Sequence, residues 1–549
     1  MRRLSLSVLA GVMLGFAFPP SHFGILACFG LIPLLVVLDG VDRTRAALGY
    51  TYVAMLIFHI ITLNWTGGYA HMNDPYMMIA GATTMTVHPL FYFAPIGAYH
   101  FVRKRAGTLA ALLALPFLWV AYEYSHTLSE WSFPWLSLGN TQSYDLSRIQ
   151  IVSVTGVLGL SFWILWMNVI GYLLVTSFQT KGINFKQKKN VVLIAVLLAL
   201  YVSPMVYGAF VLQGAPPMAQ PISPTTEASN SLITVGMVQS NVDPWEKWTK
   251  SGFETINMYL GMTDELVKSN AGHKPDLVLW PETAIPYSIL QPRNRLTLDL
   301  LRQRLSEIGV PVLSGFPYSF FYEDSTKAPP SAKRIQSTGE RWDAYNATGL
   351  IQPGVDDVRW YGKMKMVPIA ERVPYADAFY YFDFLRWGVG IGGWQIGRDT
   401  VVFEEKKTGA KFCSLICYES VYPEFVTEFV KRGAEFITIV TIDSWWDHMS
   451  GAYQHHQYAI FRAVENHRWV ARCAVGGFSS YIDPFGRVYD KTELFSQTNL
   501  NRTIQRITNA QASTFYTRHG DWLAKICVLV SALVLLSVIV RKYSNRKMK

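Results

Sequence analysis

Cysteine is scarce in this sequence, which has five cysteines among 549 residues. Cys28 and Cys527 lie in long apolar runs, where a cysteine behaves as a small apolar residue. Cys413 and Cys417 would lie roughly 13 Å apart on an extended strand at about 3.3 Å per residue. A disulfide needs Cα atoms within about 7 Å of each other. A bridge between these two residues is therefore excluded.

The spacings of a metal centre are also lacking. His448, His455 and His456 lie near Asp447, but the chain has no His-x-x-x-His pair and no paired-cysteine motif. Adjacent residues point apart on a helix, so His455 and His456 would not face one metal ion. We therefore expect no catalytic metal and no other cofactor.

A glycine pattern of the dinucleotide-binding type is present without its structural context. Gly388, Gly390 and Gly393 match G-x-G-x-x-G, yet no clear strand precedes them and no helical pattern follows. A dinucleotide site is therefore not expected. We interpret residues 379–397, which begin with the run FYYFDFLRW, as an aromatic arm hinged at these glycines. Its rings could be core, or they could rest in the interfacial zone of a membrane.

Long apolar runs are the strongest positive signal. A membrane-spanning helix needs about 20 mostly apolar residues, and residues 1–213 contain seven candidates. An eighth, at 520–540, precedes a basic tail at 541–549. No small-residue cleavage site follows the first run, so we do not interpret it as a removable signal peptide. The first seven candidates cover residues 4–19, 23–39, 46–64, 76–101, 107–125, 151–177 and 190–212.

Positive charge is distributed unevenly between the loops that join these spans. If the N-terminus lies in the cytoplasm, the cytoplasmic segments hold sixteen Lys and Arg residues, whereas the short outer loops hold only Arg148. Cytoplasmic loops of membrane proteins carry an excess of Lys and Arg. The distribution therefore places the region between the seventh and eighth spans outside the cytoplasm. It also accounts for much of the net charge of +10, so we expect no nucleic-acid binding.

Residues 231–519 have the pattern of a soluble α/β domain, and the Pro/Ser/Thr-rich residues 214–230 are a linker. Short apolar runs typical of strands, such as PDLVLWPE (275–282) and AKFCSLICYE (410–419), alternate with helical patterns. This alternation predicts a layered α/β fold. The helical patterns cover residues 251–270, 293–308, 423–432 and 453–468.

Polar residues stand where apolar strands end. One run ends in Glu282 and another in Cys417, and the segment between them carries Lys363 and Glu371. Reactive groups of α/β sheets lie at the carboxyl ends of strands. A thiol is mostly protonated near neutral pH, so it needs a carboxylate to take its proton and a cation to stabilise negative charge. Taken singly, each residue is better explained as a core cysteine, a capping glutamate or a solvated lysine.

Taken together, their order and context resemble the nitrilase, or carbon–nitrogen hydrolase, superfamily, whose catalytic set is Glu–Lys–Cys. The sequence is most similar to the bacterial apolipoprotein N-acyltransferases, the integral membrane branch of that superfamily. The resemblance covers nearly the whole chain. The motifs that carry it are FAFPP (16–20), FPWLSLGNTQ (133–142), VQSN (238–241), WPETAIP (280–286), YNATGLI (345–351), YGKMKMVPIAERVP (361–374), ICYES (416–420), RAVENHR (462–468) and IDPFG (482–486).

The resemblance implies a role for each member of the set. Cys417 would be the nucleophile, Glu282 the general base and Lys363 the residue that stabilises the oxyanion. The family's spacing of eight residues between the lysine and a second glutamate selects Lys363 over Lys365, and Glu371 would orient the lysine. Family positions in or beside the substrate site correspond to Trp248, Tyr418 and Glu419.

The resemblance also implies a fold and a location. We expect an α-helical membrane bundle of about eight transmembrane helices, joined to an extracytoplasmic nitrilase-like domain with an αββα sandwich. The protein would be a multi-pass monomer of the bacterial inner membrane, with its catalytic domain on the periplasmic side.

The implied reaction is N-acylation of the N-terminal S-diacylglyceryl-cysteine of apolipoproteins. A phospholipid would donate an acyl chain to Cys417, and the thioester would pass it to the α-amino group of the acceptor in a ping-pong cycle. Two alternatives stay open: a membrane-tethered amidase that uses water as acceptor, and a non-catalytic scaffold. The many spans argue against the first, and the complete catalytic set argues against the second.

Three positions differ from the family pattern. Ile442 stands where the family often has asparagine, residues 474–477 read AVGG where many members have TNNG, and His126 stands where an arginine is usual after Glu123. None belongs to the catalytic set, so the differences bear on substrate positioning. Glu123 itself is costly in lipid and is expected to face the bundle interior or the site.

Overall fold

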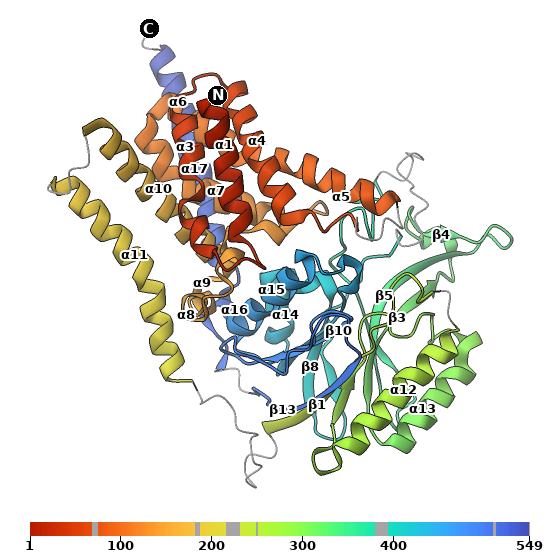
Figure 1. Cartoon of the computed structure of the whole chain (residues 1–549). Coiled ribbons are helices and arrows are strands. Elements are labelled where there is room, and N and C mark those ends of the chain that lie inside the picture. Colours follow the sequence, from red (N-terminus) through yellow and green to blue (C-terminus); the bar gives the residue numbers. More distant parts are fainter. Residues whose placement is uncertain are drawn as a thin grey trace. The chain divides into compact units, whose positions relative to one another are not determined.

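Figure 1 shows the computed structural model of the chain, which divides into two compact units. We call them the helical unit (Met1–Ala215, Met449–Phe461 and His519–Lys549) and the sheet unit (Pro216–His448 and Arg462–Arg518). Most of the predicted linker, and residues 379–392 of the predicted arm, lie outside the described residues. The structure describes residues 1–68, 75–181, 187–215, 231–248, 251–378, 393–508 and 512–547.

The helical unit is built from the apolar runs of the sequence. Among the described helices, five are long and apolar enough to cross a membrane. They are α4 (Thr44–Leu63), α7 (Thr108–His126), α10 (Val157–Lys181), α11 (Lys188–Gln213) and α17 (Trp522–Lys547). The short helices α8 (Leu146–Ile149) and α9 (Val152–Thr155) precede α10, and the first part of α15 (Ser450–Asn466) also belongs to this unit.

The three other predicted spans are shorter or interrupted. The first is α1 (Arg2–Ala17), of 16 residues, and the second contains α2 (Ala27–Gly30) and α3 (Ile32–Asp39). The fourth, predicted as one helix over 76–101, consists of α5 (Pro75–Val87) and α6 (Phe93–Ala106) with a 3-10 turn between them. This turn contains Pro89, which has no N–H group to continue the helical hydrogen bonding.

Glycine allows α1 and α4 to approach closely. A Cβ atom on Gly11 of α1 would clash with the carbonyl oxygen of Ala54 and with Ile57, both in α4. A Cβ atom on Gly15, one turn further along α1, would clash with Ile61. Small residues at such positions let membrane helices gain packing contacts, because lipid supplies no hydrophobic drive between helices.

A buried amide of α15 joins three other segments of the helical unit. The Oε1 atom of Gln454 accepts hydrogen bonds from the indole N–H groups of Trp65 (3.1 Å) and Trp135 (2.7 Å). Its Nε2 atom donates to the backbone carbonyls of Pro19 (2.9 Å) and Thr62 (3.1 Å). The amide has two acceptor and two donor sites, and all four are used. The motifs FAFPP and FPWLSLGNTQ therefore meet at one side chain.

The sheet unit contains two mixed β-sheets. The first has the strand order β13-β1-β2-β3-β5-β4, with β6 paired to β5, and β1, β2 and β3 are parallel. The second has the order β12-β11-β10-β9-β8-β7, and β8, β9 and β10 are parallel. The strands are β1 (Leu232–Gln239), β2 (Leu277–Leu279), β3 (Val312–Phe321), β4 (Lys333–Arg334), β5 (Arg341–Ile351), β6 (Arg359–Gly362), β7 (Phe403–Glu405), β8 (Ala410–Ile416), β9 (Phe436–Ile442), β10 (Val470–Val475), β11 (Ser480–Ile482), β12 (Val488–Tyr489) and β13 (Thr498–Gln505).

Helices cover the outer faces of the two sheets. The apolar sides of α12 (Gly252–Ser269) and α13 (Arg295–Ile308) pack on the first sheet around Trp280, and α14 (Pro423–Lys431) packs on β8 of the second. The sheets face each other, and the Cys473 thiol of β10 lies 3.5 Å from the Val238 carbonyl oxygen of β1. The layered α/β fold predicted for this part is therefore confirmed. The helices predicted at 251–270, 293–308, 423–432 and 453–468 correspond to α12, α13, α14 and α15.

Candidate active site

Cys417 follows directly after β8, at the carboxyl end of a parallel strand. Its φ angle of 51° lies in the left-handed region, which residues other than glycine rarely adopt. It begins the 3-10 turn Cys417–Val421, in which Ser420 Oγ donates to the Cys417 carbonyl oxygen (2.8 Å). Strained backbone of this kind persists where the surroundings enforce it, often at functional sites. No disulfide joins any of the five cysteines, all of which are described.

Glu282 reaches the same place from the first sheet, three residues after β2. Its carboxylate accepts hydrogen bonds from Asn346 Nδ2 (2.7 Å, at Oε1) and from the Ile442 backbone N–H (3.1 Å, at Oε2). Gly315 of β3 permits this approach, because a Cβ atom there would clash with the backbone of Glu282 and Thr283. Both carboxylate oxygens are thus held by partners from two different sheets.

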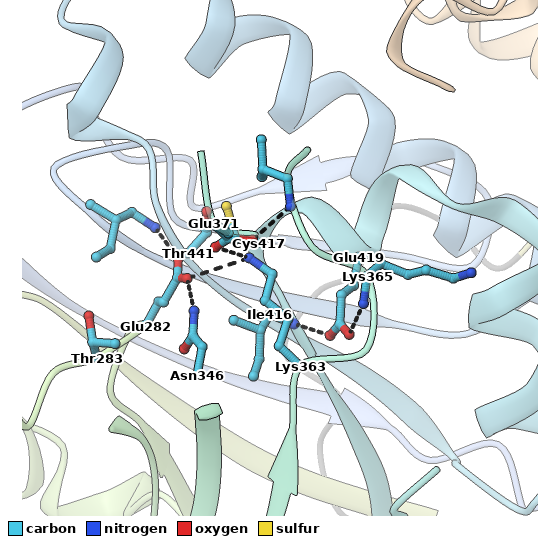
Figure 2. A network of polar contacts seen from close by, with 12 residues as sticks. Glu282, Thr283, Asn346, Lys363, Lys365, Glu371, Ile416, Cys417, Glu419 and Thr441 are labelled. Atoms are coloured by element: carbon cyan, nitrogen blue, oxygen red, sulfur yellow. Dashed lines mark hydrogen bonds and ion pairs between the residues drawn. The ribbon is translucent and has the colours of Figure 1, made fainter. Parts of the chain in front are cut away.

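Lys363 follows β6 and is fully buried. Its Nζ atom donates to Glu371 Oε1 (2.6 Å) and lies 3.8 Å from Glu282 Oε1. Glu371 is held in turn by the Val367 backbone N–H, which donates to Oε2 (2.8 Å). Figure 2 shows the Cys417 thiol beside this cluster of one ammonium and two carboxylate groups.

Burial and charge act on these groups in opposite directions. Burial lowers the pKa of the Lys363 ammonium, but the attraction of Glu371 and Glu282 outweighs it, so this pKa is raised above its ordinary value. Burial raises the pKa of Cys417, as does the nearby charge of Glu282, although Lys363 opposes both. Burial also raises the pKa of Glu282 against the attraction of Lys363. The resting site therefore combines a protonated thiol, a permanent cation and a carboxylate of increased basicity.

Glu419 joins the lysine segment to the cysteine turn. Its Oε1 atom accepts hydrogen bonds from the Tyr361 hydroxyl (2.6 Å) and the Met364 backbone N–H (2.6 Å), and its Oε2 atom from the Ile416 N–H (2.8 Å). Burial raises the pKa of Glu419 to about 7, although these hydrogen bonds oppose the shift. Glu419 therefore positions the segments on either side of the thiol.

Two other predicted site residues, Tyr418 and Trp248, differ in their exposure to solvent. Tyr418 is buried, with its ring centroid 5.4 Å from that of Tyr422. Trp248 is 47% exposed, and its ring centroid lies 5.6 Å from Lys247 Nζ. The structure thus brings Glu282, Lys363, Glu371 and Cys417 together and leaves the Trp248 indole at the surface.

Two contacts of Glu282 were not anticipated from the sequence. Asn346 donates its amide to Glu282, and its backbone carbonyl also accepts from the Lys363 N–H (2.8 Å). The motif YNATGLI contained this residue, so its place in the motif was the available signal. Ile442 contacts Glu282 through its backbone N–H, which any residue except proline would supply at that position.

Comparison with known proteins agrees with this architecture. Residues 10–170 match the apolipoprotein N-acyltransferase N-terminal domain, and residues 234–512 match the carbon-nitrogen hydrolase family. An apolipoprotein N-acyltransferase of Chlorobaculum tepidum is 34% identical over 548 residues, which cover 98% of this chain and 96% of that protein. This chain belongs to the apolipoprotein N-acyltransferase family. The resemblance seen in the sequence is thereby confirmed.

Two weaker similarities are also found. An apolipoprotein N-acyltransferase of Geobacter metallireducens is 29% identical over 537 residues, which cover 96% of this chain and 94% of that protein. A solved structure, of a member of branch 10 of the nitrilase superfamily from Saccharomyces cerevisiae, is 14% identical with a TM-score of 0.37. The alignment covers 52% of this chain and 93% of that one.

Proposed function

We propose that this chain transfers a fatty acyl group from a phospholipid to the N-terminal S-diacylglyceryl-cysteine of apolipoproteins. Two observations support the proposal: membership of a family whose relatives are named for this reaction, and the buried cluster of Glu282, Lys363 and Glu371 beside the Cys417 thiol. The cluster supplies a base, a cation and a nucleophile within one strand-end site.

In the first half-reaction, Glu282 takes the thiol proton as Cys417 Sγ attacks the ester carbonyl of the lipid. The C–S bond forms, and the carbonyl oxygen becomes an oxyanion that the Lys363 ammonium stabilises. Collapse of this intermediate breaks the ester C–O bond. The proton on Glu282 passes to the departing alkoxide, so that lysophospholipid leaves and an acyl thioester remains on Cys417.

In the second half-reaction, the α-amino group of the apolipoprotein attacks the thioester in its unprotonated form. A second oxyanion forms at the same place, so Lys363 acts in both steps. Glu282 takes the proton of the attacking amine and returns it to the departing thiolate of Cys417. The product is an amide, and the enzyme regains its resting protonation.

Measurement of the intact mass after incubation with phospholipid tests the proposal. We expect an added mass of one acyl chain that hydroxylamine, which cleaves thioesters, removes. Addition of a diacylated lipopeptide should also remove it, with the acyl chain recovered on the peptide amine. Release of free fatty acid at the same rate with and without the lipopeptide would instead favour the membrane-tethered amidase.

A further inference from the structure

A buried lysine that has no part in the proposed chemistry lies behind the base. Lys247 follows β1, in a turn that its backbone N–H closes by donating to the Asp243 carbonyl oxygen (3.0 Å). The residue is only 3% exposed, although it directly precedes the exposed Trp248. A charged side chain is rarely buried to this extent unless it is hydrogen-bonded or paired.

Its ammonium group contacts the segment that carries the base. Lys247 Nζ donates to the Glu282 backbone carbonyl oxygen (3.1 Å) and to the Thr283 hydroxyl oxygen. Thr283 has a φ angle of 45°, in the left-handed region that a β-branched residue seldom adopts. Such a conformation persists only where its surroundings hold it. Lys247 therefore hydrogen-bonds to the residues on both sides of the Glu282–Thr283 peptide bond.

The charge of Lys247 also acts on the Glu282 carboxylate. Burial lowers the pKa of Lys247 to about 7, and the attraction of Glu282 opposes this shift. Among the groups that act on Glu282, Lys363, the Asn346 amide and Lys247 favour its ionised form, and Glu371 disfavours it. Lys363 also pairs with Glu371 at 2.6 Å, and the charge of Lys247 adds to that of Lys363 in favouring the ionised form of Glu282.

We propose that Lys247 is a positioning residue for the base of the proposed acylation reaction. It holds the Glu282–Thr283 backbone through two hydrogen bonds, and its charge keeps the Glu282 carboxylate ionised at lower pH. Lys247 acts on the reaction through Glu282, to whose backbone carbonyl it donates. The inference depends on the proposed function, because it assigns a partner to the base of that reaction.

The test is the pH dependence of thioester formation on Cys417, measured by intact mass with a phospholipid donor. Lys247→Met removes the charge and both hydrogen bonds but keeps an unbranched apolar stem. We expect the acylation rate to fall about tenfold, which is only part of the roughly 10²–10⁴-fold contribution of a general base, because Glu282 itself stays in place. The KM for the phospholipid should stay unchanged. Without the cation the pKa of Glu282 rises, so the acid limb should move to higher pH.

Three further variants separate positioning from loss of structure. Lys247→Arg retains the cation and should restore the acid limb toward its original pH. Thr283→Val removes only one acceptor, so it should slow acylation less than Lys247→Met. Lys274→Met is the matched control, because Lys274 Nζ also donates to a backbone carbonyl, that of Ile308 (2.9 Å), but not to the base segment. It should leave rate and pH profile unchanged.

The outcomes distinguish this inference from the proposed function. If the wild-type protein forms no thioester with phospholipid, the proposed function fails. If it forms the thioester and Lys247→Met has the wild-type rate and acid limb, the positioning role is wrong. The positioning role is also wrong if Lys247→Met acylates more slowly but its acid limb is unshifted, or if only its KM for the phospholipid is raised. If Lys247→Met does not fold, a wild-type acylation rate in Thr283→Val together with a shifted acid limb in Lys247→Arg, which keeps the cation, would overturn it.

Discussion

Lys363 carries its charge between two carboxylates in a place without solvent exposure. A buried ion is stable only when partners compensate for its lost hydration, and removal of one partner leaves the other uncompensated. The Lys363, Glu371 and Glu282 side chains therefore depend on one another at the residue scale. The same balance leaves Cys417 protonated at rest, because burial and Glu282 raise its pKa.

The first prediction concerns the acylated residue. Incubation with phospholipid should place the acyl chain on Cys417 and not on Cys413 or Cys473, whose side chains are fully buried within the second sheet. Cys417→Ser should lose turnover, because a serine hydroxyl is much harder for a carboxylate to deprotonate than a thiol. Peptide mapping that finds the chain on another cysteine, or full activity in Cys417→Ala, would refute the assignment.

The second prediction separates two lysines of one motif. Lys363→Ala should slow both half-reactions by about 10²–10³-fold, the usual cost of one oxyanion donor. Lys365 points away from the thiol (Figure 2), and its Nζ atom lies 5.1 Å from the ring centroid of Tyr422. Lys365→Ala should therefore be much milder. Single-turnover rates of acylation and of transfer to a lipopeptide measure this, and equal losses in the two variants would contradict the proposed division.

At the scale of elements, the site depends on turns at the ends of strands from both sheets. β2 leads to Glu282, β6 to Lys363 and β8 to Cys417, and the Ile442 N–H at the end of β9 donates to the Glu282 carboxylate. The Glu419 carboxylate connects the β6 and β8 turns by accepting backbone N–H groups from each. The positions of Glu282, Lys363 and Cys417 thus depend on the hydrogen bonds that connect these turns.

Glu419→Gln provides the third prediction. An amide in place of the carboxylate turns one acceptor into a donor, which then faces a backbone N–H group. We expect a loss of about 1–3 kcal/mol in the free energy of unfolding, the cost of an unsatisfied buried donor, and slower acylation of Cys417. The control is Glu428→Gln, which breaks an exposed pair with Lys431 worth about 0–1 kcal/mol. Equal melting temperatures and acylation rates in the two variants would rule out this role.

The fourth prediction concerns α15. Gln454→Met should remove the Gln454 oxygen to which the indole N–H of Trp135 donates. It also removes one of the two acceptors of the Trp65 indole N–H and leaves the other, the Thr62 carbonyl oxygen. Buried unsatisfied donors cost about 1–3 kcal/mol each, so the helical unit should melt at a lower temperature in detergent. Gln457→Met is a matched change on the same helix, at a side chain whose Oε1 atom has no hydrogen-bond partner among the described residues. A comparable loss in both variants would show that the amide network is not the cause.

At the scale of the whole molecule, the chain combines a helical unit rich in apolar helices with a layered α/β unit. The reaction proposed here uses two lipid-bearing substrates, so an active site on a membrane-anchored chain reaches both. The side of the membrane on which the sheet unit lies remains a prediction from loop charge.

Reporter fusions test this orientation, which is the fifth prediction. A reporter that is active only outside the cytoplasm should work when fused after Asn230 and fail when fused after Lys188, because sixteen basic residues lie on the side of Lys188 and one on the other. A cytoplasmic reporter provides the reciprocal control. Activity of the external reporter after Lys188 would overturn the proposed topology.

Much of the fold was predictable because its signals are local. Apolar runs of spanning length, charge in short loops and alternation of strand and helix patterns are properties of neighbouring residues. Prediction was least accurate where a local irregularity interrupts a run, as at Pro89, or where a run is too short to form one long helix, as in residues 23–39. Hydropathy averages over such breaks.

The sequence by itself determined the family, the α/β class of residues 231–519 and the identity of the cluster residues Glu282, Lys363, Glu371 and Cys417, because motif order and spacing are written along the chain. Only the tertiary structure decided what surrounds them. The Asn346 amide and the Ile442 N–H donate to the Glu282 carboxylate across 64 and 160 residues of sequence, and Lys247 reaches the Glu282 carbonyl across 35. Such partners depend on strand register and on the packing of two sheets, which no local pattern encodes.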